Sequence, residues 1–274
     1  MLKKLLKYDF LSVKRFVLPL MLLTPAASFV FGMIGYIANL IDSPVVQMGL
    51  MTMYVISLIA LFLSVTLLPV LLIVRYYSGM FGDAGYVSLL LPVSRKLLLL
   101  SKVLYALILM LWYLLFAFFS IGFAFCVPDT AHSGHTIFYA YVLAFDLVKG
   151  LFTTFGGFSA GGLVAFVFYL IFMMTFLLNL FYTGVTLGAA IFQGKAKVAG
   201  AIAFCVASYM IWSVIKTAIE AIPTAIIVSR GVEAMMNATV LRIFLIAEMA
   251  LYAGFSVLLF FLNSRLIDRK LNLT

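Results

Sequence analysis

Two polar side chains inside long apolar runs, Asn179 and Glu248, are the first candidates for chemistry in this sequence. A charged carboxylate at the centre of a membrane helix costs at least about 2.5 kcal/mol, so Glu248 should face other helices or a wet cavity. The amide of Asn179 can form hydrogen bonds across helices. Structural pairing and a place along a translocation path both explain such residues, and the sequence leaves both explanations open.

The remaining polar patterns do not indicate an enzyme. Lys216 and Glu220 are four residues apart, which predicts an ion pair on one helix face. His132 and His135 lack an evident third ligand, so we interpret them as solvated loop residues. The stretch GAAIFQGKA (188–196) has too many residues between its glycines for a phosphate-binding loop, and alanine replaces the required Ser or Thr. We therefore expect no catalytic residue, metal or cofactor on this chain.

Membrane helices must hold these residues in place. Hydrophobic residues make up 66% of the 274-residue chain and charged residues 10%, against about 25% charged residues in soluble domains. The apolar runs are continuous and lack the alternation of a β-barrel. We expect an all-α integral membrane protein, with residues 1–274 forming a single transmembrane domain. Six spans are expected, at about 17–40, 48–74, 103–127, 163–187, 198–219 and 240–263.

The basic residues mark one side of these spans. Of the 18 Lys and Arg residues, 14 lie before the first span, between the second and third, between the fourth and fifth, or after the sixth. The positive-inside rule assigns these four regions, and with them both termini, to the cytoplasm. The net charge of +9 then needs no nucleic acid as a partner. We expect a multi-pass protein of the cell membrane.

Three segments are predicted to lie outside the spans. Residues 1–16 have apolar positions at helical spacing with lysines beside them, which favours an amphipathic helix in the cytoplasmic interface over a plain basic flank. Residues 128–162 form the predicted extracellular segment. Residues 75–102 form the longest cytoplasmic interruption, in which Ser94 can cap a helix that begins at Arg95. A short, polar, glycine-bounded segment of this kind suits docking of a soluble partner.

The cytoplasmic stretch FGDAGYVSLLLPVSRKLLLLSK (81–102) resembles a segment of ABC-2-type transporter permeases of Gram-positive bacteria. In that family an acidic-x-Gly-Tyr run precedes Leu-Pro, a Ser/Thr-Arg pair and a later Lys. The stretches LLKYDF, GVTLGAAIFQGKAK and RKLNL also fit, so the resemblance covers the whole chain. Within the family the chain looks most similar to exporters of amphipathic or antimicrobial peptides, including phenol-soluble modulin exporters.

The resemblance implies a coupling helix in this segment that docks on a separate ATPase subunit. The positions that match the coupling helix are Phe81, Gly82, Asp83, Gly85 and Tyr86. It further implies that ATP and magnesium bind to the partner ATPase, that a second permease copy completes a homodimer within membrane lipid, and that a hydrophobic or amphipathic peptide is exported. Asn179 and Glu248 are then the candidates for the translocation path.

Several other functions compete with this one. Importer permeases have a longer spacing between the loop glycine and the proline than Gly85 and Pro92 show. A membrane-embedded enzyme would need clustered polar residues within the spans. A non-transporting membrane sensor or immunity protein, and an ABC exporter of lipid or drug, stay open as alternatives.

Overall fold

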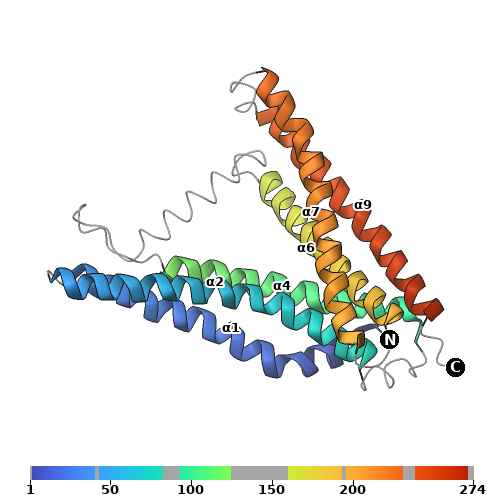
Figure 1. Ribbon diagram of the computed structural model, residues 1–274, viewed down its shortest axis with the longest axis horizontal. Coiled ribbons are helices and arrows are strands. Elements are labelled where there is room, and N and C mark those ends of the chain that lie inside the picture. Colours follow the sequence, from blue (N-terminus) through green and yellow to red (C-terminus); the bar gives the residue numbers. More distant parts are fainter. Residues whose placement is uncertain are drawn as a thin grey trace. The chain divides into compact units, whose positions relative to one another are not determined.

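The computed structural model describes residues 2–40, 43–82, 93–124, 160–192, 196–230 and 238–270. Asp83, Gly85 and Tyr86 lie outside these ranges, and so do residues 128–159 of the predicted extracellular segment. The described residues form helices α1 (Leu2–Leu40), α2 (Pro44–Phe81), α4 (Arg95–Ala124), α6 (Ala160–Ile191), α7 (Ala196–Arg230) and α9 (Ala238–Lys270) (Figure 1).

Four of these helices are long and apolar enough to cross a membrane, over Arg95–Ala117, Val164–Ile191, Ala196–Ala221 and Leu245–Asp268. Helix α1 adds a fifth if its two bent halves count as one span. In α2, within the part whose side chains the structure describes, Thr66–Phe81 forms a shorter apolar helix. The all-α membrane class is thereby confirmed, and the count of six spans stays a prediction.

Helix α1 is bent by 50° between Leu2–Arg15 and Val17–Val30. Pro19 explains this position, because a proline ring clashes with the carbonyl four residues earlier, here that of Arg15. The bend therefore falls where the sequence separates residues 1–16 from the first span. The interfacial position of that first half stays a prediction.

The chain divides into two compact units. One contains Met1–Asp9, Leu72–Leu107 and Leu151–Thr274, and the other contains Phe10–Leu71 and Ile108–Gly150. In the first unit α6 packs against both α7 and α9 (Figure 1). The hydrophobic core between these three helices consists of Phe176, Leu180, Trp212 and Tyr252.

Two glycines allow α6 and α7 to approach closely. A Cβ on Gly184 would lie 3.0 Å from the backbone of Cys205, and a Cβ on Gly188 would overlap the backbone of Ala201. The Cys205 thiol lies 3.4 Å from the carbonyl oxygen of Phe181, to which it donates. Small residues permit such close contact between membrane helices, so the GVTLG stretch (184–188) serves helix packing.

Candidate functional site

The predicted coupling segment, residues 75–102, begins within the last turns of α2 and ends within the first turns of α4. Phe81 is the last residue of α2, and the amide of Gly82 donates to the carbonyl of Tyr77 at 3.2 Å. A Cβ on Gly82 would lie 2.8 Å from the carbonyl oxygen of Ser78, closer than Cβ atoms approach in proteins. Glycine at position 82 therefore allows the chain to turn immediately after the helix.

Helix α4 begins directly after Ser94, as predicted. The Ser94 carbonyl accepts hydrogen bonds from the amides of Leu97 and Leu98 at 2.9 and 3.1 Å. This bonding is typical of the residue that precedes the first turn of a helix. The first turn of α4 thus defines where the chain re-enters a helix after residues 83–92.

Arg95, the first residue of α4, binds the end of α9. Its guanidinium donates to the carbonyls of Ile267 and Asp268 at 2.9 and 3.0 Å, and its Nε lies 3.9 Å from the Asp268 carboxylate. The last carbonyls of a helix have no partner within the helix and carry partial negative charge. Arg95 therefore attaches the start of α4 to the end of α9.

Tyr76, five residues before the end of α2, joins three helices through a chain of hydrogen bonds. Asn263 on α9 donates through Nδ2 to the Tyr76 hydroxyl at 3.3 Å. The hydroxyls of Tyr76 and Thr186 are 3.0 Å apart, and Thr186 on α6 donates to the Tyr182 carbonyl at 2.8 Å. Since Thr186 uses its only proton in that bond, Tyr76 must be the donor to Thr186. The three side chains are almost fully buried.

Aromatic contacts surround this chain of hydrogen bonds. The rings of Tyr76 and Tyr182 are stacked, with centroids 3.9 Å apart and planes 7° apart. The ring of Phe81 lies edge-on to that of Tyr76, with centroids 6.1 Å apart. Tyr76, Tyr182 and Tyr105 rank among the largest fully buried side chains of the protein. Phe81, a predicted contact residue, therefore packs against the buried Tyr76.

A buried ion pair adds the beginning of α1 to this core. Lys102 of α4 pairs with Asp9 of α1, and both side chains are nearly inaccessible, at 14% and 12% exposure. The Ser101 hydroxyl lies 2.8 Å from the Leu98 carbonyl oxygen and 3.2 Å from the other carboxylate oxygen of Asp9, and these two acceptors share its single proton. The Lys102 ammonium also lies 5.9 Å from the ring centroid of Tyr105. We name these contacts, with those of Arg95 and Tyr76, the tyrosine core.

The tyrosine core joins several helices through hydrogen bonds, an ion pair and aromatic contacts. It attaches the helices on both sides of residues 83–92 to α1, α6 and α9. Among the described residues, no group of three His, Cys, Asp or Glu side chains could hold a metal. The letters GFSAG (157–161) match the GxSxG pattern of hydrolases. That pattern belongs to a turn between a strand and a helix; α6 begins at Ala160, and residues 125–159, where the strand would lie, are outside the described residues.

Glu248 lies far from the coupling segment along α9, in a small group of polar and aromatic residues. The hydroxyl of Tyr169 donates to Glu248 Oε2 at 3.2 Å. Lys216 Nζ lies 3.3 Å from Glu220 Oε1, which confirms the predicted pair on α7. A cavity of about 20 Å³ brings these groups together; it is lined by Trp212, Lys216, Ile219, Glu220, Glu248, Leu251 and Tyr252. That volume holds about one water molecule.

Asn179 and Glu248, the two path candidates, do not meet. Asn179 is 2% exposed and donates to the Ser256 hydroxyl at 2.9 Å, so its bond between α6 and α9 agrees with the expectation. Tyr169, the partner of Glu248, is ten residues earlier on α6, or about 15 Å along the helix axis. Both candidates therefore lie where α6 faces α9, at different depths.

Polar contacts recur along α9, where Glu248 and Ser256 bind α6 and Asn263 binds Tyr76 of α2. On α9 the participants are Glu248, Ser256 and Asn263, at spacings of eight and seven residues. Such spacings place side chains on one face of a helix every two turns. Sequence reasoning missed Ser256, Asn263 and Tyr76, although the repeated spacing on α9 was a usable signal for the first two.

Replacing Tyr76 with Phe should lower the free energy of unfolding by about 1–3 kcal/mol, because the buried amide of Asn263 loses its acceptor. Tyr77→Phe is the matched control, since the neighbouring side chain is half-buried and forms no hydrogen bond with the described residues. It should change stability by less than about 0.5 kcal/mol. Unfolding of both variants in detergent, followed by circular dichroism, measures this difference. Equal stabilities of the two variants would show that the Tyr76 hydroxyl does not stabilise the fold.

No family model matches this sequence, and comparison with curated proteins and with solved structures also yields no match.

Proposed function

We propose that the chain is the membrane-spanning permease subunit of an ATP-driven ABC exporter. We infer the family from the resemblance of residues 81–102 to ABC-2-type permeases. Its structural support is the tyrosine core, because a permease must convert movement of a cytoplasmic segment into movement of its spans. In this proposal ATP and magnesium bind to a separate ATPase subunit, and this chain contributes no catalytic residue.

One observation carries the proposal. The helices that enter and leave residues 83–92 are joined to α9 through Asn263 and the α9 carboxyl end, to α6 through Thr186, and to α1 through Asp9. A segment meant only to connect two spans needs no such attachments. When the ATPase pair closes on ATP, the docked segment would move and carry these helices with it, changing the side to which the pathway opens.

The proposed topology has six spans, both termini in the cytoplasm and residues 128–162 outside the cell membrane. Single cysteines at Ser94, Ser133 and Asn272, in a chain lacking Cys126 and Cys205, test it in intact cells. An impermeant thiol reagent should label position 133 and leave positions 94 and 272 unlabelled. Labelling of position 94 or 272, with position 133 protected, would overturn this topology.

The proposed substrate is an amphipathic peptide, exported by a homodimer. Its support is the resemblance together with the composition of the spans, since the chain has 27 Phe and 14 Met residues but few charges within the apolar runs. Apolar and adaptable side chains suit a hydrophobic substrate of variable shape and suit a sugar poorly. Glu248, if exposed to the pathway, would favour cationic peptides.

Vesicles containing the permease with its ATPase test the function. A cationic amphipathic peptide should stimulate ATP hydrolysis several-fold and accumulate on the far side of the membrane, whereas a small sugar should do neither. Glu248→Gln should weaken stimulation by the cationic peptide and leave stimulation by a neutral amphipathic peptide unchanged, so the neutral peptide serves as the control. Stimulation by the sugar alone, or a strictly monomeric active permease, would contradict the proposal. Absence of any associated ATPase would favour the sensor or immunity alternative.

A further inference from the structure

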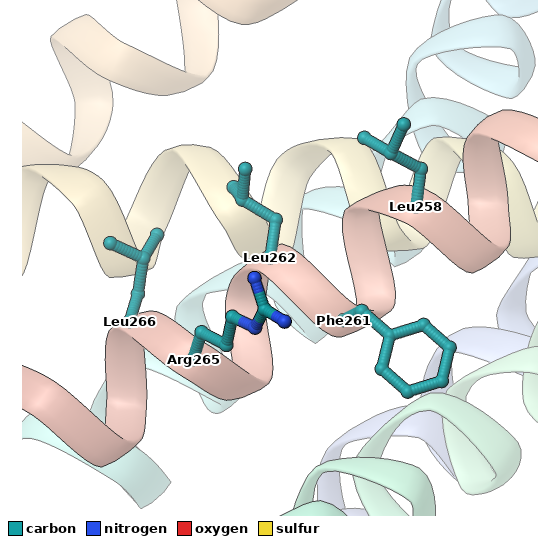
Figure 2. Close-up of a pocket in the computed structure, with 5 residues that line it drawn as sticks. All are labelled: Leu258, Phe261, Leu262, Arg265 and Leu266. Carbon is teal, nitrogen blue, oxygen red and sulfur yellow. The ribbon is translucent and has the colours of Figure 1, made fainter.

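A groove of about 430 Å³ runs along α9 near the basic side of the molecule. Its lining consists of Leu258, Phe261, Leu262, Arg265 and Leu266. Figure 2 shows the three leucines in a row along one side of the helix, with Phe261 on another side and the Arg265 guanidinium turned back toward Leu262. The described lining of the groove thus combines an apolar stripe with the cation of Arg265 at one end.

The position of the groove matches the boundary of the membrane. The apolar stretch of α9 ends at Asp268, so Arg265 lies in its last turn, while Leu258 lies about 10 Å deeper along the axis. Leu258 and Phe261 are more than half exposed. In a bilayer this surface would face lipid tails, and Arg265 would lie at the level of the headgroups.

Arg265 differs from Arg95 and Lys102 in having no anionic partner among the described residues. Arg95 binds the end of α9, and Lys102 binds Asp9. Arg265 is exposed, and no carboxylate among the described residues pairs with it. A guanidinium can bind a phosphate through two parallel hydrogen bonds, and basic sites beside membrane helices bind anionic lipids.

We propose that this groove binds an anionic phospholipid of the leaflet on the basic side, with the phosphate on Arg265 and one acyl chain along Leu258, Leu262 and Leu266. Charge decides between this occupant and a second copy of the chain. A two-fold symmetric contact is self-complementary, so it would place the Arg265 of one copy on the same face as the Arg265 of the other. Among the described lining residues, no anion would balance either charge. The lipid supplies both the negative charge and the apolar length.

Lipid binding to the full-length protein in detergent can be measured by native mass spectrometry. Phosphatidylglycerol and phosphatidylcholine with identical acyl chains serve as probes, and glycerol phosphate represents the headgroup without tails. The wild-type chain should bind phosphatidylglycerol about tenfold more tightly than phosphatidylcholine. Arg265→Gln should remove this preference, whereas Lys96→Gln, which removes an exposed cation on the same side, should keep it. Leu258→Trp should weaken binding of both lipids by filling the groove.

Four results would overturn the proposal: no headgroup preference in the wild-type chain, equal losses in Arg265→Gln and Lys96→Gln, unchanged lipid binding in Leu258→Trp, or competition by glycerol phosphate as strong as by the whole lipid. Efficient disulfide dimers of a Leu262→Cys variant in vesicles would also overturn it, because they would identify a second copy as the occupant. Size-exclusion profiles and helical circular dichroism confirm that each variant is folded. The proposal does not depend on transport and can fail or hold independently of the exporter function.

Discussion

Replacing Asp9 with Asn is expected to destabilise the protein by about 3–5 kcal/mol. The substitution leaves the Lys102 ammonium in a site where its side chain is only 14% exposed, and removing one partner of a buried pair costs this much because the other charge stays unpaired. The ring of Tyr105 and the hydroxyl of Ser101 cannot replace a carboxylate as a counter-charge. Unfolding in detergent, followed by circular dichroism, measures the loss.

Two control variants separate the effect of burying an ion pair from the effect of removing a charge. Glu220→Gln breaks an ion pair whose side chains are 41% and 50% exposed, and it should cost less than about 0.5 kcal/mol. The double variant Asp9→Leu with Lys102→Met removes both charges and keeps apolar volume, so it should recover most of the stability of the wild-type protein. If Asp9→Asn costs no more than Glu220→Gln, the ion pair does not hold α1 against α4.

Replacing Tyr86 with Ala is expected to lower peptide-stimulated ATP hydrolysis and transport at least tenfold in vesicles, while the permease stays folded and inserted. The proposal places Tyr86, with Asp83 and Gly85, in the segment that docks on the ATPase. Helices α2 and α4 on either side belong to the tyrosine core, so loss of docking stops movement from reaching the spans. The fraction of ATPase that co-purifies with the permease distinguishes a variant that no longer docks from one that docks but no longer passes the movement on to the spans.

Tyr8→Ala is the matched control for this variant. Tyr8 is 70% exposed on α1, next to Asp9 and among the basic residues of the N-terminus, so in the proposed topology its loss removes an aromatic ring from the cytoplasmic side. Transport by this variant should stay within about twofold of the wild-type rate. If transport and ATPase assembly survive substitution at Asp83, Gly85 and Tyr86 together, the docking site lies elsewhere.

Local features of the fold could be predicted because they depend on nearby residues. The start of α4 after Ser94 follows from a capping residue before an apolar run, and the Lys216–Glu220 pair follows from a spacing of four residues. The bend of α1 follows from Pro19. Asn179 was correctly expected to form hydrogen bonds across helices, but its partner, Ser256, was not identified.

The tyrosine core could not be predicted, because its partners are distant in sequence. Lys102 and Asp9 are 93 residues apart, and Asn263 and Tyr76 are 187 residues apart. On the sequence Lys102 was one of several basic residues that mark the cytoplasmic side, and Arg95 was the start of a helix. Nothing in their spacing distinguishes a cation that faces water from one that binds a buried carboxylate or the end of another helix.

The sequence by itself determined the membrane class, the helical fold and the basic side of the molecule. These properties depend on composition and on short periodic patterns, since an apolar run of sufficient length must form a helix to satisfy its backbone hydrogen bonds in lipid. Only the tertiary structure decided which polar side chains are paired. It placed Asp9 against Lys102, Tyr76 between Thr186 and Asn263, and Glu248 beside Tyr169, and it left Arg265 exposed without a carboxylate partner among the described residues. Pairing depends on how helices distant in sequence pack together, and every helix of this chain offers several polar residues that could have formed such contacts.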